Sequence, residues 1–164
     1  MNMRKSFLFF AAMSVAAMAA WAQDQADPRI KQALDSIGLK YSVNSSNNYK
    51  VVYTMDNDAD RSQLVFIVSK TETYRSVELR EIWSVAAVLD EYPGEETIHY
   101  ILNMNSTSKI GAWAIEEADD GEFWLLYTTK VPVDLTPNGL KDIVYFVAEV
   151  CDEMEAELVG DDEY

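Results

Sequence analysis

The sequence TPNGLKDIVYFVAEVCDEMEAEL, residues 136–158, is the stretch that decides the fold of this chain. It opens with Thr136 and Pro137, a capping residue followed by the proline that is typical of the first helical position. At 100° per residue its apolar side chains fall within an arc of about 120°, and acidic side chains lie opposite. The segment therefore predicts a long amphipathic helix that ends at Gly160. Its apolar stripe comprises Leu140, Ile143, Val144, Val147, Val150, Cys151, Met154 and Leu158.

A helix with one apolar face needs a second layer to pack against, and the segments before it supply a sheet. Residues 111–117 and 123–131 are β-like, and they are joined by Asp119, Asp120 and Gly121, which favour a hairpin turn. Further β-like runs with alternating or wholly apolar residues occur earlier in the chain. These are residues 49–55, 64–68 and 74–88.

Two shorter helices complete the predicted fold. Asp27 and Pro28 open the first, which ends at Gly38, and residues 95–105 form the second after a break at Pro93 and Gly94. The order is then α-β-β-β-α-β-β-α. This order predicts a single α+β domain in which three helices pack on a five-stranded antiparallel sheet.

The first 22 residues have the features of a secretory signal peptide. Arg4 and Lys5 form a basic start, an apolar run follows, and small residues flank Trp21 before a predicted cut after Ala22. The apolar run is shorter than the roughly 20 residues that span a bilayer. We therefore expect a periplasmic or secreted protein with no membrane insertion after cleavage. It would consist of one domain at residues 23–159 and an acidic C-terminal tail at residues 160–164.

Acidic residues dominate the composition. The chain has 28 Asp and Glu residues against 13 Lys and Arg residues, for a formal net charge of −15. A charge of this sign argues against nucleic acid as a partner, because binding a phosphate backbone requires a basic surface. The single cysteine excludes an intrachain disulfide, and the single histidine excludes a His-rich metal site.

Several motifs in the second half of the chain occur in the same order as in the proteins of a known family. They are Ile101-Leu102-Asn103-Met104-Asn105, Lys109-Ile110-Gly111-Ala112-Trp113, the acidic turn to Gly121, the strand ending Lys130-Val131-Pro132 and the amphipathic helix from Thr136. With these motifs the chain resembles the YbjN family of bacterial proteins, most specifically over residues 102–132. The resemblance implies a fold like that of class I type III secretion chaperones and a sensory-transduction or regulatory role. It supplies no catalytic residues, because none are established for the family.

Cys151 and His99 are the residues that a nucleophilic or acid–base mechanism would use first. Cys151 lies within the apolar stripe, with no Lys, Arg or His near it in sequence to lower its pKa, so we interpret it as a core residue. His99 is about 100° away from Ile98 on the second helix, which indicates a surface position. The sequence therefore predicts no catalytic residue and no cofactor.

Residues 56–60 contain a possible cation site. Asp56, Asp58 and Asp60 have the alternate spacing of a calcium-binding loop. The sixth and twelfth positions of an EF-hand require Gly and Glu, but this chain has Arg61 and Ile67 there. The loop is therefore a weak Ca²⁺ candidate and otherwise an acidic hairpin turn.

Aromatic and apolar residues in the last two strands are candidates for a partner surface. Five strands and three helices leave room for an incompletely covered sheet face, where apolar side chains would meet a partner. The alternative is that they are cross-strand pairs within the core. The candidate residues are Trp113, Ile115, Phe123, Trp124 and Leu126.

Three functional hypotheses follow. The favoured one is an exported, non-catalytic binding protein, chaperone-like or regulatory, that engages a peptide, a protein or a second copy of itself as a homodimer. The second is a cation-responsive envelope protein that uses residues 56–60. The third is a small hydrolase with an unrecognised site, for which His99 and Cys151 are the named candidates.

Overall fold

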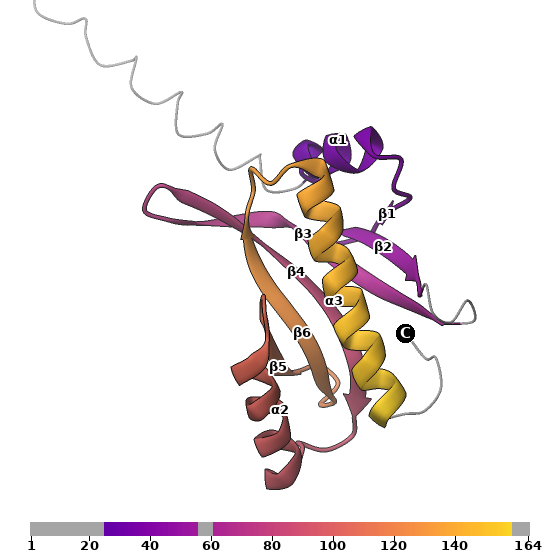
Figure 1. The fold of residues 1–164 in the computed structure, drawn as a ribbon, viewed down its shortest axis with the longest axis vertical. Coiled ribbons are helices and arrows are strands. Elements are labelled where there is room, and N and C mark those ends of the chain that lie inside the picture. Colours follow the sequence, from indigo (N-terminus) through magenta and orange to yellow (C-terminus); the bar gives the residue numbers. More distant parts are fainter. Residues whose placement is uncertain (1–24, 56–60, 159–164) are drawn as a thin grey trace, which may run out of the picture.

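A computed structural model describes residues 25–55 and 61–158, and within these ranges the chain folds as three helices and one six-stranded sheet (Figure 1). The predicted export signal at residues 1–22, the acidic loop at residues 56–60 and the predicted tail at residues 160–164 lie outside the described residues. The predicted α+β class is confirmed. In chain order the elements are α1 (Pro28–Ser36), β1 (Ser42–Val43), β2 (Tyr49–Thr54), β3 (Ser62–Tyr74), β4 (Val77–Leu89), α2 (Glu95–Thr107), β5 (Ala112–Glu117), β6 (Phe123–Pro132) and α3 (Pro137–Leu158).

The strands lie in the order β1-β2-β3-β4-β6-β5, and every neighbouring pair is antiparallel. The prediction of five strands is wrong, and so is the predicted element order, because a short strand β1 precedes the others. Its two residues pair with Tyr49 and Lys50 at the start of β2. A two-residue strand carries no alternation, so the sequence pattern could not reveal it.

The hairpin of β3 and β4 also differs from the prediction. β3 continues to Tyr74, the chain turns at Arg75 with a φ of 56°, and β4 begins at Val77. The predicted strand at residues 74–88 therefore contains the end of β3 and the turn itself. Residues 69–73 are polar but stay in β3, because the backbone pairing with β4 resumes at Thr71 after an irregularity that follows Ile67. The far end of the hairpin extends beyond the body of the protein (Figure 1).

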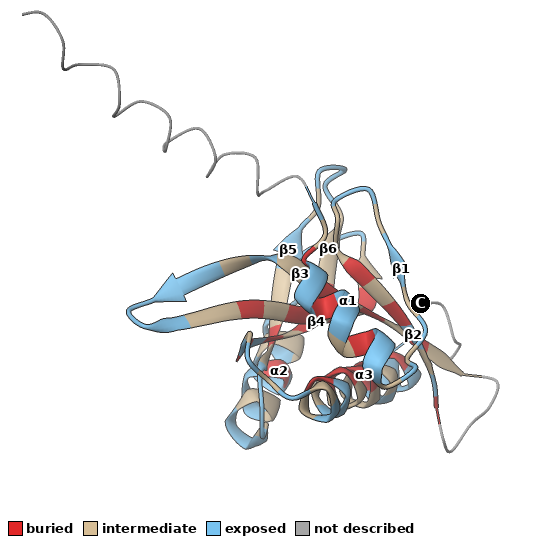
Figure 2. Ribbon diagram, turned by 90° about the horizontal axis from the view of Figure 1, so that it is seen from above, coloured by how far each residue is buried: buried red, intermediate tan, exposed pale blue. Residues whose placement is uncertain are grey.

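All three helices lie on one side of the sheet (Figure 2). The long helix α3 packs across β3, β4 and β6 and supplies one wall of the core. The predicted apolar stripe is confirmed for most of its length, but Leu158, in the last turn, is 45% exposed. The buried members of the stripe are Leu140, Val144, Val147, Cys151 and Met154.

The first helix is held to the sheet by a buried ion pair. Asp27 is the N-cap of α1, and its carboxylate accepts a hydrogen bond from the backbone N–H of Arg29, as the sequence predicts. The same carboxylate lies 2.7 Å from the guanidinium of Arg80, whose side chain is only 3% exposed. Arg29 also bridges Asp27 to Glu78 on β4. The N-terminus of α1 is thus fixed by charged groups on the core side of the sheet.

The second helix covers the free edge of β5. Asn105 donates its side-chain amide to the carbonyl of Trp113 at 3.2 Å, and its side-chain oxygen accepts the N–H of Trp113 at 2.7 Å. The amide of Asn105 therefore pairs with β5 as a further strand would, which satisfies backbone groups that an edge strand otherwise exposes.

Candidate binding surface

The side of the sheet away from the helices carries a row of stacked aromatic rings. Phe66 on β3 and Trp83 on β4 are cross-strand partners with ring centroids 4.2 Å apart and planes at 15°. Trp124 on β6 stacks on Trp83 with centroids 6.3 Å apart and planes at 27°. These residues alternate with buried core residues along their strands, which places them on the face opposite α3. We call this side the open face.

Aliphatic side chains extend the row of rings. The strand register aligns Val52, Leu64, Val85 and Leu126 across four neighbouring strands. Val52 is 65% exposed, whereas Leu126 is buried although none of the described helices α1, α2 and α3 covers this side of the sheet. The open face therefore has an apolar centre that runs across β2, β3, β4 and β6.

Charged side chains border the apolar centre toward the β3–β4 hairpin. Lys130 lies 2.8 Å from Glu72, and the hydrogen bond between them lowers the pKa of Glu72 and raises that of Lys130. Glu81 accepts a hydrogen bond from the hydroxyl of Thr128. Glu72, Glu81 and Lys130 line a hollow of about 110 Å³ together with Lys70 and Arg80. An apolar centre with a charged border is typical of protein-binding surfaces.

Stacking limits what the rings can bind. Trp83 lies on the strand between those of Phe66 and Trp124 and stacks with both, so its ring faces are already in contact with other rings. Sugar rings and isolated bases bind to free aromatic faces, whereas protein side chains also pack on ring edges. The ring faces of Trp83 are therefore less available to a sugar ring or a base than those of an isolated aromatic side chain.

The predicted partner surface is divided between the two sides of the sheet. Only Trp124 and Leu126 lie on the open face. Trp113 is 5% exposed and packs edge-on against Tyr127 in the core, with centroids 5.1 Å apart. Ile115 packs against the core, and Phe123 contacts Tyr92. The other residues of the open face, Phe66 and Trp83 above all, were missed, because their pairing depends on a register between strands that sequence alternation does not fix.

Cys151 and His99 do not form a joint site, because one is buried on α3 and the other is exposed on α2. Cys151 is fully buried on α3, where its thiol donates to the carbonyl of Ser84 at 3.4 Å. Burial raises the pKa of this thiol to about 12. The side chain of His99 on α2 is 68% exposed and lies 3.9 Å from the carboxylate of Glu95. These positions agree with the interpretation of Cys151 as a core residue and His99 as a surface residue.

Cys151 should therefore resist alkylation in the folded protein. Because the reactive form is the thiolate, a buried thiol with a raised pKa reacts only when the chain opens. We expect denaturing urea to increase the rate of iodoacetamide labelling at pH 8 by at least about a hundredfold, measured by mass spectrometry. Equal labelling rates with and without urea would show that the thiol is accessible in the native state.

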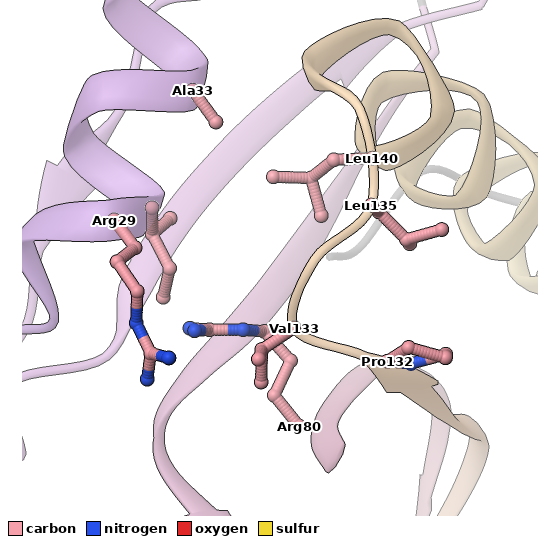
Figure 3. Close-up of a pocket in the computed structure, with 8 residues that line it drawn as sticks. Arg29, Ala33, Arg80, Pro132, Val133, Leu135 and Leu140 are labelled. Atoms are coloured by element: carbon pink, nitrogen blue, oxygen red, sulfur yellow. The ribbon is translucent and has the colours of Figure 1, made fainter. Parts of the chain in front are cut away.

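A cavity beside α1 is too small to act as a substrate site (Figure 3). It has a volume of about 40 Å³ and lies between Arg29, Arg80 and Leu140. A volume of this size holds water but no organic ligand of ordinary size. The two guanidinium groups seen there are the ones that Asp27 binds, so the charges beside this cavity hold α1 in place.

The described residues contain neither a cluster of metal ligands nor a membrane-spanning helix. Residues 25–55 and 61–158 contain no group of three or more His, Cys, Asp or Glu side chains that could hold a metal ion. Asp56, Asp58 and Asp60 lie outside the described residues, so the Ca²⁺ candidate stays a prediction. Among the described helices none is long and apolar enough to cross a membrane.

No protein-family model, curated protein or solved structure matches the chain. The resemblance to the YbjN family thus rests on the sequence motifs and stays a prediction, as does a fold specifically like that of the secretion chaperones.

Proposed function

We propose that this chain is an exported, non-catalytic binding protein whose open face receives a protein or peptide. The observation that carries the proposal is the stacked row of Phe66, Trp83 and Trp124 on the sheet face opposite the described helices. Aromatic side chains in such a cluster supply large contact area and are frequent anchors of protein interfaces.

In this proposal the helix side of the sheet stabilises the domain and the open face binds the partner. The helix side buries the core, including Val65, Ile82 and Leu125, and stabilises the domain. The open face contributes little to that core and keeps exposed apolar area, such as that of Val52, in contact with water. Covering this area with a partner removes it from water at a gain of roughly 25 cal/mol per Å² before the costs of association.

The resemblance to the YbjN family supports a chaperone-like or regulatory role for this binding. The predicted export signal would place the partner in the periplasm or outside the cell. A second copy of the chain is the other candidate partner, but the net charge of −15 opposes self-association through long-range repulsion.

The proposal predicts that a charge at the edge of the open face weakens binding of the partner. We expect Val52→Asp to reduce partner capture about tenfold or more, because an aspartate would have to be buried without a counter-ion. Purified exported protein would be immobilised and exposed to an envelope extract, and bound proteins quantified by mass spectrometry. The matched control is Leu102→Asp on α2, since Leu102 is 58% exposed against 65% for Val52 and lies on the helix side.

The oligomeric state separates a foreign partner from a second copy. Light scattering coupled to size exclusion should give a mass near 18.6 kDa or slightly less if the partner is another protein, and about twice that if the face pairs with itself. A protein that remains monomeric and whose captured proteins are the same for wild type, Val52→Asp and Leu102→Asp would refute the proposal.

A further inference from the structure

The helix side of the protein contains a second cavity, which the proposed function does not use. It has a volume of about 280 Å³ and lies where the end of β4, the start of α2 and the last turn of α3 meet. Its floor includes Ala87 and Leu125, both buried residues of the sheet. Thr97 on α2, Leu158 on α3 and the exposed side chain of Glu91 also line it.

The cavity exists because α2 and α3 diverge. α2 packs on the edge strand β5 and has a single buried residue, Ile101, among its described positions. A hydrogen bond of 2.8 Å from the hydroxyl of Tyr100 to Glu157 links α2 to α3 beyond the cavity. The space between the helices is therefore bridged at the surface and not filled by side chains from within.

The size of the cavity fits a small organic molecule. A cavity of about 150 Å³ with apolar walls holds a benzene ring, so about 280 Å³ accommodates a chain of roughly ten carbon atoms. The walls are mostly apolar, with Glu91 as the one ionised lining residue. An apolar pocket with one fixed polar group is the usual form of a ligand site.

The charge of the surrounding segments favours a ligand whose headgroup is positively charged. Residues 81–108, which form β4 after Arg80, α2 and their connection, contain no Lys or Arg, and neither do residues 142–158 of α3. Both segments contain several acidic residues, of which Glu91 lines the cavity and Glu157 directly precedes its lining residue Leu158. An anionic headgroup at the rim would be repelled, whereas a cationic one would be attracted.

We propose that this cavity binds a small cationic amphiphile, with an apolar chain of roughly ten carbons between α2 and α3 and a protonated amine at the carboxylate of Glu91. Ala87 and Leu125 contact the chain from the sheet, and Leu158 covers it from α3. The cavity lies on the helix side, so this inference does not depend on the proposed function of the open face.

Three ten-carbon probes that differ in headgroup test the proposal. Decylammonium, decanol and decanoate would be titrated into the whole protein by calorimetry at pH 7, with the two ions below their micelle concentrations and decanol below its solubility limit. We expect the affinity to fall in that order, with decylammonium binding at a stoichiometry of one. Equal affinities for decylammonium and decanoate, or a stoichiometry well above one, would overturn the proposal.

Two substitutions assign the binding to the cavity. Thr97→Phe fills the space from α2 and should weaken decylammonium and decanol alike by at least about tenfold. Glu91→Gln leaves the space open and should weaken decylammonium about three- to fivefold without affecting decanol. Asp142→Asn removes the same charge at the opposite, exposed end of α3 and should change neither. An unchanged affinity in Glu91→Gln, a surface variant that should fold normally, would exclude the proposed amine site.

Discussion

Replacing Asp27 with asparagine should lower the free energy of unfolding by about 3 to 5 kcal/mol, because it leaves the guanidinium of Arg80 buried without its counter-ion. The two groups lie 2.7 Å apart, and the Arg80 side chain is only 3% exposed. Its remaining partner is the carbonyl of Val68 at 3.3 Å, which carries no full charge. Urea unfolding followed by tryptophan fluorescence would measure the loss.

Asparagine separates the effect of charge from that of helix capping. Asn is as good an N-cap as Asp, so Asp27→Asn keeps the hydrogen bond to the Arg29 N–H, whereas Asp27→Ala should lose about 1 kcal/mol more. The control is Glu78→Gln at the exposed end of the same network, which should shift the urea midpoint far less. Replacing Arg80 as well, in Asp27→Asn with Arg80→Met, should restore part of the loss. A single Asp27→Asn variant as stable as wild type would contradict this account.

The same ion pair makes the free energy of unfolding depend on pH in the acidic range. Burial alone would raise the pKa of Asp27, but hydrogen bonds from Arg29 and Arg80 outweigh burial and hold it at about 2, against 3.8 for a free aspartate. Because the pKa is lower in the folded state, the pair contributes its full stability above about pH 4 and loses it as the pH falls toward 2. The difference in stability between wild type and Asp27→Asn should shrink over that interval.

Gly111→Ala should be destabilising by about 3 to 5 kcal/mol, through backbone strain and steric overlap together. Gly111 has a φ of +84°, where residues with a Cβ are strained. A Cβ there would lie 2.5 Å from the carbonyl oxygen of Thr128, which belongs to β6 opposite Ala112 at the start of β5. Relief of the overlap requires β5 and β6 to separate, so we expect a large drop in the urea midpoint.

Two other glycines provide matched controls for that variant. Gly121 has a φ of +89°, but a Cβ there would have no atom within 4 Å, so Gly121→Ala reports the strain alone, about 1 to 2 kcal/mol. Gly94 has a negative φ and open space, but it is the N-cap of α2, where Ala is less favourable than Gly, so Gly94→Ala should cost no more than about 1 kcal/mol. If Gly111→Ala and Gly121→Ala were equally unstable, the contact with β6 would have no energetic effect.

Local patterns in the sequence were sufficient to predict the kinds of element. The period of the apolar residues gave the α3 stripe, and Asp27 with Pro28 marked the start of α1, as the structure confirms. Alternation predicted the larger strands but not their ends. β3 runs on through polar residues 69–73, and β1 is too short to produce a pattern. Backbone pairing, which depends little on side-chain polarity, decides both cases.

The candidate binding surface was harder to predict than the fold. Alternation shows that Trp113 and Ala112, or Trp124 and Leu125, point to opposite sides of a strand, but it does not say which side the helices cover. The sequence therefore indicated an apolar sheet face without separating its residues from those of the core.

By itself the sequence determined an acidic α+β domain with one long amphipathic helix, because helix and strand periods are properties of neighbouring residues. Only the tertiary structure decided that α1, α2 and α3 share one side of the sheet. This arrangement of the helices buries Trp113 and leaves Trp83 on the open face. It also joins Asp27 to Arg80 across 53 residues and leaves the cavity between α2 and α3. Each of these depends on packing between segments far apart in the chain, where local periodicity contains no information.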